Sequence, residues 1–470
     1  MQYVSTRGEA PILDFEGVLL AGLAGDGGLY LPQSWPVFSA AEWRAMRGLS
    51  YAELAFTLMR PYVGGVIPDA DFRRMINEAY ATFGHKAVTP LSQLDANDWL
   101  LELYHGPTIA FKDVALQLLG RLFDWALARS GKRATILGAT SGDTGSAAIE
   151  GCRGRQALEI FILFPHGRVS DVQRRQMTTV ADANVHAIAL EGTFDDAQAM
   201  VKTLFGEAAF RERAGLTAVN SINWARVMAQ IVYYAAAALS LGAPDRPVAF
   251  CVPTGNFGDI FAGYCAARMG LPVHKLIVAT NRNDILTRFF ESGDYRKGGV
   301  APTISPSMDI QVASNFERLL FDLHGRDGAE IRAMMAALDS DGGFSVSANA
   351  LAETRHLFAA GRADEAATHA AIAAGFRQTG RLIDPHTAVG LHVAAEARAR
   401  GIVPADLPLV TLATADAAKF PAAVQAATGQ HPPLPARMAD LFERPERMTI
   451  LPNDVNAVRG FIDGIIGGQA

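Results

Sequence analysis

The stretch His105-Gly106-Pro107-Thr108-Ile109-Ala110-Phe111-Lys112-Asp113 places one lysine where a polar turn leads into a strongly apolar segment. From Val114 onward the apolar residues recur four apart, which predicts an amphipathic helix over 113–129. Lys112 then lies at the start of this helix, where a cation opposes the helix dipole and where burial lowers the pKa of an amine. Lys112 is therefore a candidate imine-forming residue. The alternative, open for any single lysine, is a solvated side chain beside a helix start.

Beyond the first hundred residues, short β-branched runs alternate with amphipathic helices, which is typical of parallel sheets joined by crossover helices. The sequence therefore predicts an α/β fold, with a long apolar helix over 224–241. Strands are expected at 134–137, 158–163, 185–190, 247–252, 274–279 and 407–412.

The first hundred residues have a different pattern, with glycines and a proline near the start and helices expected near 40–60 and 69–83. The region 320–380 is rich in alanine and charged residues at helical spacing, which predicts surface helices. We expect three parts, namely an amino-terminal domain at 1–95, a large α/β domain at 96–135 and 224–470, and a small mobile α/β domain at 136–223.

The composition excludes several classes of function. The chain has 470 residues, half of them apolar, and its net charge of −6 includes no basic block that could follow a nucleic-acid backbone. No apolar segment has the length that a bilayer requires, so neither nucleic acid nor membrane partners are expected. The three cysteines lack the paired spacing of metal sites, and the start of the chain does not resemble a signal peptide. We therefore expect no metal and a cytoplasmic location.

A first glycine-rich turn, Gly138 to Gly145, follows the strand expected at 134–137. Small residues let the backbone approach an anion closely, and the free amides of a helix start attract negative charge. The turn is neither a Walker loop nor a GxGxxG motif. Taken alone, the motif favours a capped turn with no ligand over a carboxylate or phosphate site.

A second turn of this kind, Pro253 to Asp259, again lies between an apolar strand and a helix. Gly255 and Gly258 can adopt positive φ and Asp259 can cap the helix, which would leave backbone amides free for a phosphate. Many α/β turns share these features, so this turn supports a phosphate site only in combination with Lys112 and the first glycine-rich turn.

Two further segments add polar groups. Asn220 to Arg226 offers amide and hydroxyl donors and an arginine, whose planar fork suits phosphate, and a helix cap with a surface arginine is an equally open alternative. Thr414 ends an apolar strand, where open α/β sheets bind ligands, and its hydroxyl could face a heterocyclic nitrogen. Together, the lysine, the amide-rich turns and this hydroxyl suit pyridoxal phosphate.

With these residues in view, the chain resembles the threonine synthases, in the longer form found in fungi and many Gram-negative bacteria. The resemblance covers essentially the whole chain and rests on many blocks in the same order. These blocks are 3–8, 26–30, 105–113, 140–145, 220–226, 254–259, 308–311, 314–317 and 384–388.

The resemblance implies a fold-type-II pyridoxal-phosphate enzyme that converts O-phospho-L-homoserine and water into L-threonine and phosphate by γ-elimination and β-addition. Lys112 matches the Schiff-base lysine, which also serves as acid and base, and Phe111 matches the residue beside the cofactor ring. Gly255, Asn256, Phe257 and Gly258 match the cofactor-phosphate loop, and Thr414 matches the partner of the ring nitrogen. The substrate-binding residues implied are Ser141, Gly142, Asp143 and Thr144 for the carboxylate, and Asn220, Ser221 and Arg226 for the phosphate.

One departure from the family pattern lies after Thr414. The family usually reads Thr-Ala-His-Pro-Ala-Lys-Phe, whereas this chain has Asp416 and Ala417 in place of the His-Pro pair. A carboxylate that reached the ring nitrogen would favour its protonated form and alter the electron sink. His105 is a further candidate for substrate binding, with a buried structural histidine as the alternative.

Other functions stay open at this stage. A serine or threonine dehydratase or a sulfhydrylase would share the cofactor but would not need the phosphate group of residues 220–226. A non-catalytic relative that binds the cofactor is favoured only by the altered pair at 416–417. The substrate is expected to be a small molecule and the protein a monomer or homodimer. Residues near 136–223 are expected to close over the bound substrate and exclude water.

Overall fold

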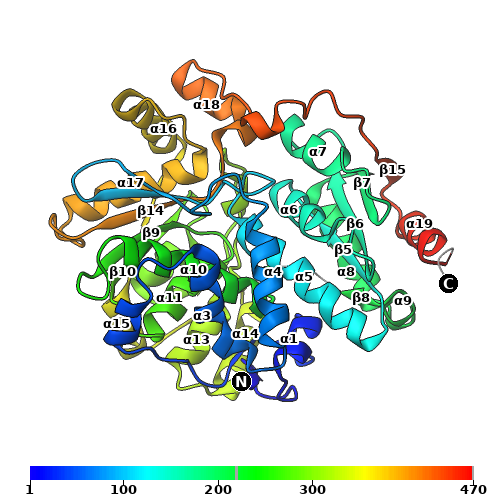
Figure 1. The fold of residues 1–470 in the computed structure, drawn as a ribbon, viewed down its shortest axis with the longest axis horizontal. Coiled ribbons are helices and arrows are strands. Elements are labelled where there is room, and N and C mark those ends of the chain that lie inside the picture. The colour runs from blue at the N-terminus through cyan, green and yellow to red at the C-terminus, as the bar shows by residue number, and fades with distance from the viewer. Residues whose placement is uncertain (218–220, 468–470) are drawn as a thin grey trace.

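The computed structural model describes residues 1–217 and 221–467, and it has the α/β fold that the sequence predicts. Two parallel sheets lie side by side, with helices between and around them (Figure 1). The smaller sheet, with helices α6 to α9, lies on the right of the view, and the larger sheet lies on the left.

The larger sheet has six strands within the described residues, and all neighbours are parallel except the outer pair β3 and β4. Its spatial order is β13 (Phe358–Arg362), β10 (Val273–Thr280), β9 (Val248–Pro253), β14 (Leu409–Ala413), β4 (Asp98–Glu102) and β3 (Leu91–Gln93).

The smaller sheet is entirely parallel among the strands described. Its order is β15 (Thr449–Pro452), β7 (Val185–Glu191), β6 (Leu158–Pro165), β5 (Ala134–Ala139) and β8 (Leu216–Thr217). The edge strand β15 comes from the end of the chain, so the segment 224–470 contributes to both sheets. Two short antiparallel pairs complete the strands: β1 (Tyr3–Ser5) with β2 (Tyr30–Pro32), and β11 (Asp294–Arg296) with β12 (Gly343–Ser345).

The helices up to residue 292 are α1 (Phe15–Ala21), α2 (Ala40–Ala45), α3 (Tyr51–Val63), α4 (Asp69–Tyr80), α5 (Lys112–Ser130), α6 (Asp143–Cys152), α7 (Asp171–Thr178), α8 (Phe194–Gly206), α9 (Ala208–Ala214), α10 (Trp224–Ser240), α11 (Gly258–Arg268) and α12 (Ile285–Ser292). The later helices are α13 (Phe316–Leu323), α14 (Gly328–Ser340), α15 (Ala348–Leu357), α16 (Glu365–Thr379), α17 (Pro385–Ala399), α18 (Pro421–Thr428) and α19 (Val455–Gly467), with short 3-10 turns at 306–308, 417–419 and 436–438.

Both faces of the larger sheet are buried, which explains its nearly continuous apolar strands. In β9, Val248, Phe250 and Val252 pack into the main core, whereas Ala249 and Cys251 alternate with them and pack against α17 on the opposite face. Because successive side chains of a strand point to opposite faces of the sheet, the side chains of β9 contribute alternately to two different hydrophobic cores.

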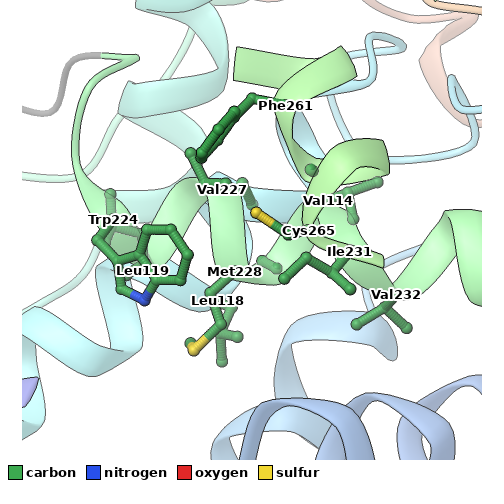
Figure 2. Close-up of a cluster of buried hydrophobic side chains, with 14 of the residues drawn as sticks. Val114, Leu118, Leu119, Trp224, Val227, Met228, Ile231, Val232, Phe261 and Cys265 are labelled. Carbon is green, nitrogen blue, oxygen red and sulfur yellow. The ribbon is translucent and has the colours of Figure 1, made fainter. Parts of the chain in front are cut away.

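The main core lies where α5, α10 and α11 meet (Figure 2). Val114 and Leu118 of α5 contribute to this cluster with Trp224 and Met228 of α10 and Cys265 of α11. All are buried, and the same cluster continues without a break into the helices of the first hundred residues. Burial of this kind contributes about 1.5 to 3 kcal/mol for each large apolar side chain, which fixes the start of α5 relative to both sheets.

The strands and helices expected beyond residue 130 are confirmed to within a few residues. The region 320–380 is helical as expected except at two strands, β12, which pairs with β11, and β13, which pairs with the edge of the larger sheet. The strand β4 lies in the stretch where no strand was expected. Within the described residues, no helix is both long and apolar enough to span a bilayer.

Candidate active site

Lys112 is the first residue of α5, and backbone pairing with the end of β14 sets its position. The Phe111 amide donates to the Thr414 carbonyl at 2.8 Å, and Ala110 forms an antiparallel bridge with Ala415. This pairing brings together Phe111, Lys112 and Thr414, three of the residues proposed for the cofactor. The centre of the Phe111 ring lies 5.5 Å from the Lys112 amine.

The turn before Lys112 is held by the buried carboxylate of Asp113. Asp113 accepts hydrogen bonds from the backbone amide of Thr108 at 2.7 Å and from its hydroxyl at 2.6 Å. A side chain at Gly106 would lie 2.4 Å from Asp113, and Ile109 adopts a φ of 54°. Burial raises the pKa of Asp113 to about 6. The turn is therefore a tightly specified structure rather than a flexible entry to the helix.

Asp143 faces the Lys112 amine from the start of α6. One of its carboxylate oxygens lies 3.5 Å from Lys112 Nζ, and the other lies 3.1 Å from Nζ of Lys419 and accepts a hydrogen bond from Gln173 at 3.0 Å. Burial opposes ionisation, but Lys419 and then Lys112 hold the pKa of Asp143 well below its usual range. Burial also lowers the pKa of Lys112, which is 9% exposed as a residue, and Asp143 only partly opposes this effect.

Lys419 is the residue that the sequence analysis did not single out. Its side chain is fully buried, and its amine also donates to the Thr108 carbonyl and to Gln176, each at 2.9 Å. The available signal was weak, since it consisted of one lysine in the apolar run Ala417 to Phe420. Two buried lysines, from opposite ends of the chain, therefore share one carboxylate.

The turn from Gly138 to Gly145 is organised by Thr140. Its hydroxyl accepts hydrogen bonds from the amides of Gly142 and Gly145, both at 2.9 Å. Gly142 has a φ of 134°, and a side chain there would collide with Gln173. Ser141 is exposed and Thr144 is half-buried at the start of α6, so both lie at the mouth of the turn.

The turn at 254–258 differs in detail from the expectation. The positive φ, 64°, falls on Phe257 and not on Gly255 or Gly258. The backbone at Gly255 instead packs closely against another segment, since a side chain there would lie 2.5 Å from the Ser307 carbonyl. The expected cap by Asp259 is also wrong. Its carboxylate is buried and accepts hydrogen bonds from the hydroxyls of the two tyrosines Tyr233 and Tyr234 on α10.

Asn315 joins the turn at 254–258 to the segment that precedes α10. Its side-chain amide donates to the carbonyl of Asn256 at 3.2 Å and to that of Ser221 at 3.0 Å. Two of the predicted binding segments therefore lie side by side. Asn220, which was predicted to bind substrate, lies outside the described residues.

Arg226 is the most unusual cation of the region. Its side chain lies in the first turn of α10, is only 3% exposed, and leaves Nε and Nη1 without a hydrogen-bond partner among the described residues. Burial lowers its pKa to about 10, and its charge in turn lowers the pKa of Lys112. A buried guanidinium without a counter-charge is costly, which is the condition that a bound anion relieves.

Ser307 connects Lys112 to a buried dyad. Its hydroxyl lies 3.5 Å from Lys112 Nζ and 3.4 Å from Asp143, and its backbone amide donates to His386 Nε2 at 3.2 Å. Nδ1 of His386 must then carry the proton, and it lies 2.9 Å from the fully buried carboxylate of Asp384. The dyad thereby fixes the tautomer of the ring and the position of Ser307.

Two other predicted residues have partners outside this cluster. His105 Nε2 lies 2.8 Å from Glu102, which also binds Arg381. Asp416 accepts a hydrogen bond from the Ala418 amide at 2.9 Å, and it caps the short turn at 417–419 that carries Lys419. The altered residue thus has a local structural role.

The residues present fit pyridoxal phosphate. A buried amine of lowered pKa is available for its aldehyde, and an aromatic ring lies beside that amine. The turn at 254–258 leads into the start of α11, where the first backbone amides of a helix can bind a phosphate, and Arg226 adds unpaired buried donors. The buried amines of Lys112 and Lys419 share the carboxylate of Asp143, and the buried guanidinium of Arg226 has two donors without a partner among the described residues, so the site favours anionic ligands.

Comparison with known proteins gives the same picture over the whole chain. The family model for the threonine synthase N terminus matches residues 2–80, that for pyridoxal-phosphate dependent enzymes matches 82–362, and that for the threonine synthase C-terminal part matches 387–462. A threonine synthase from Pseudomonas aeruginosa is 58% identical, with 98% of each chain covered.

Solved structures agree with these matches. A PLP-bound threonine synthase from Brucella melitensis superimposes with a TM-score of 0.96 at 57% identity, and the yeast threonine synthase superimposes with a TM-score of 0.95 at 39% identity. In each case 99% of both chains is covered. The dehydratase and sulfhydrylase alternatives are therefore set aside. The chain belongs to the threonine synthase family of pyridoxal-phosphate-dependent enzymes.

Proposed function

We propose that this protein converts O-phospho-L-homoserine and water into L-threonine and phosphate, with Lys112 as the covalent attachment point of the cofactor. The observation that carries the proposal is the buried Lys112 amine, which faces Asp143 at 3.5 Å inside a cluster with an excess of positive charge. Such a cluster suits a substrate and a cofactor that each carry a phosphate.

When bound, pyridoxal phosphate supplies an aldehyde that condenses with amines and a ring that stores the electron pair left by a departing proton. Gly255, Asn256, Phe257 and Gly258 would hold its phosphate through backbone amides at the start of α11. Phe111 would pack beside its ring, and the hydroxyl of Thr414 would face the ring nitrogen.

Lys112 is placed to move the protons of the reaction. Burial lowers the pKa of its amine, which increases the neutral fraction that can accept a proton from the α-carbon of the substrate. Asp143 and the hydroxyl of Ser307 each lie 3.5 Å from the amine and 3.4 Å from each other, so they restrict where the amine can point from one side. In this proposal the same amine would also serve proton transfers at the β- and γ-carbons of the substrate.

The substrate is held at its two anionic ends in this proposal. Ser141, Gly142, Asp143 and Thr144 would orient the carboxylate through the start of α6, with Lys112 and Lys419 offsetting the charge of Asp143. The phosphate would bind Arg226, Ser221 and Asn220. His105 stays a prediction as a substrate-binding residue.

Replacing Arg226 with glutamine is expected to raise the KM for O-phospho-L-homoserine about 10- to 100-fold, since a hydrogen bond to a charged group contributes about 1.5 to 3 kcal/mol. The stability of the enzyme is expected to stay unchanged or to rise, because the guanidinium is buried without partners. Steady-state kinetics and urea unfolding measure the two effects. Arg226→Lys, which keeps the charge but loses the fork, should lie between. An unchanged KM in Arg226→Gln would remove Arg226 from the phosphate site.

Replacing Asp384 with asparagine is expected to lower kcat about 10- to 100-fold, with less effect on KM. The amide of the new side chain would donate to His386 Nδ1 and move the ring proton to Nε2, where it would oppose the Ser307 amide. Displacement of about 1 Å at a reacting group costs up to about 100-fold.

The control for this variant is Thr387→Val, which removes another hydrogen bond from the same carboxylate without touching the histidine. It should lower stability and leave kcat almost unchanged. An equal loss of kcat in both variants would show that the carboxylate acts through general stability and not through His386.

We also retain as proposals a small mobile domain over 136–223 and a three-part division with 1–95 and with 96–135 plus 224–470. The ion pair between Asp143 and Lys419 joins the start of α6, beside the smaller sheet, to the turn that follows β14 of the larger sheet. A movement of 136–223 relative to the larger sheet would therefore change the distance between these two residues. Structures of the enzyme free and bound to a substrate analogue test this, and superimposable structures would contradict it. A cytoplasmic location, consistent with three unpaired buried cysteines, and a monomer or homodimer complete the proposal.

Measuring inorganic phosphate and threonine together tests the function itself. The two products should appear in equal amounts from O-phospho-L-homoserine, with little ketoacid. Ketoacid from threonine or serine would indicate a dehydratase. Cofactor bound without turnover of either substrate would indicate a non-catalytic relative.

A further inference from the structure

A second concentration of positive charge lies away from Lys112, near the other end of α5. A cavity of about 430 Å³ opens between α4, α5 and the turn that follows α6. Four arginines line it, Arg74, Arg121, Arg129 and Arg155, and only two lining carboxylates, Glu78 and Asp124, oppose them. Nothing in the proposed reaction uses this cavity.

The carboxylates nearby are already shared. Glu78 lies 3.2 Å from Arg74 and 3.6 Å from Arg121, and the longer distance exceeds that of a hydrogen bond. Arg74 also contacts Asp71, at 3.3 Å, and Asp124 accepts a hydrogen bond from the Ala157 amide. The side chains on hand therefore leave part of the guanidinium charge without a partner.

Two guanidinium groups in particular are incompletely satisfied. The Nε atoms of Arg121 and Arg155 are buried and have no partner within hydrogen-bonding distance among the described residues; Nε of Arg121 is the atom that lies 3.6 Å from Glu78, and its Nη1 donates to the Gln117 carbonyl at 2.6 Å. The side chain of Arg121 is only 10% exposed, and burial followed by the charge of Arg155 lowers its pKa to about 10. Two like charges brought together in a half-closed cavity destabilise each other unless an anion lies between them.

We propose that this cavity is a binding site for a small multiply charged oxyanion, held mainly by Arg121 and Arg155. Phosphate esters and polycarboxylates share the required chemistry, since planar guanidinium groups bind both in bidentate fashion. Trp125, whose face is covered by Arg129 at 4.7 Å, gives the cavity one apolar wall for the uncharged part of such a ligand.

The position of the cavity links it to the active site through two helices. Lys112 begins α5 and Asp143 begins α6. The two helices cross where a side chain on Gly120 would lie 2.0 Å from the Gly151 carbonyl, so their backbones are in contact. An anion bound by Arg121 of α5 and by Arg155, which follows α6, would stabilise this contact between the two helices.

The test uses the cofactor-loaded enzyme with Arg226→Gln, which removes the unpaired guanidinium of the active site. Pyrophosphate and citrate are titrated separately by calorimetry. We expect saturable binding of at least one of them, weakened at least about tenfold by adding Arg155→Gln, in line with the loss of charged hydrogen bonds. Arg121→Gln should act in the same direction.

The matched control is Arg129→Gln, which removes the same charge from the same cavity but from a guanidinium that covers Trp125. It should weaken binding less than about threefold. Binding of pyrophosphate alone would identify a phosphate ligand, and binding of citrate would extend the site to carboxylates. An absence of saturable binding, or an equal loss in the Arg129 and Arg155 variants, would overturn the proposal.

A location test that does not depend on affinity is an anomalous difference map from crystals soaked in selenate. A peak between Arg121 and Arg155, absent in Arg155→Gln crystals, is the expected result. A peak only beside Arg226 would also overturn the proposal while leaving the proposed active site intact.

Discussion

Replacing Lys112 with alanine is expected to lower kcat/KM for threonine formation by at least about 10³-fold. The variant loses both the covalent attachment of the cofactor and the amine that moves protons, and general acid-base catalysis alone contributes about 10² to 10⁴. The visible absorption of the covalently held cofactor should disappear, while binding of its phosphate at 254–258 can persist. Absorption spectra of the purified variant and product assays measure the two effects.

The structure makes the control for this experiment unusually direct, because a second buried lysine faces the same carboxylate. Lys419 lies 3.1 Å from Asp143, against 3.5 Å for Lys112. Lys419→Met should retain the absorption of the attached cofactor, whereas Lys112→Ala should lose it. The reverse pattern would make Lys419 the attachment point and would overturn the assignment of Lys112.

Local sequence patterns were sufficient to predict α5 and the two glycine turns. The apolar residues of 113–129 repeat at helical spacing, and Gly131 with a φ of 62° ends the helix where the pattern stops. The turns could be recognised because each combines small residues with the end of an apolar strand. In each case the residues that form the pattern lie close together in the sequence, so the pattern can be recognised without knowledge of tertiary contacts.

The strands β13 and β4 could not be predicted in this way. The sequence of β13, Phe358 to Arg362, contains two alanines and a glycine, which favour no strand, and it becomes extended because the edge of β10 offers its hydrogen bonds. The charged residues at the two ends of β4, half-buried Asp98 and buried Glu102, similarly mask its apolar centre. Tertiary context decided both cases.

The polar contacts of the site were even less accessible from sequence. Asp143, Lys419 and His386 come together from α6, the turn before α18 and α17, and no local pattern indicates that they meet. The position of the positive φ in the second turn was not predictable either, since it falls on Phe257 and not on Gly255 or Gly258. Residue types were predictable, but their partners were not.

Replacing Asp143 with asparagine is expected to lower the free energy of unfolding by about 3 to 5 kcal/mol, the usual effect of removing one partner from a buried ion pair. The change keeps the shape of the side chain but leaves Lys112 and Lys419 without their shared carboxylate. Urea unfolding of the wild type and the variant at pH 7 measures the difference.

The pH dependence distinguishes this electrostatic cause from a packing defect. In the wild type, the lowered pKa of Asp143 makes its stabilising contribution complete above about pH 4, the pKa of an unfolded aspartate. In the variant, the pKa of Lys112 falls further below its unfolded value of about 10.4 because the carboxylate that opposes the effect of burial is gone, so folding releases protons and stability rises with pH up to that value. The difference between wild type and variant should therefore narrow from pH 7 to pH 10.

Gln173→Met provides the matched control, because Gln173 is a neutral partner of the same carboxylate. Its loss should cost about 0.5 to 1.5 kcal/mol, and the cost should not depend on pH over the same interval. A stability difference for Asp143→Asn that stays constant from pH 7 to pH 10 would show that the two lysines do not carry the charge that Asp143 compensates. The excess of positive charge on which the proposed site depends would then be absent.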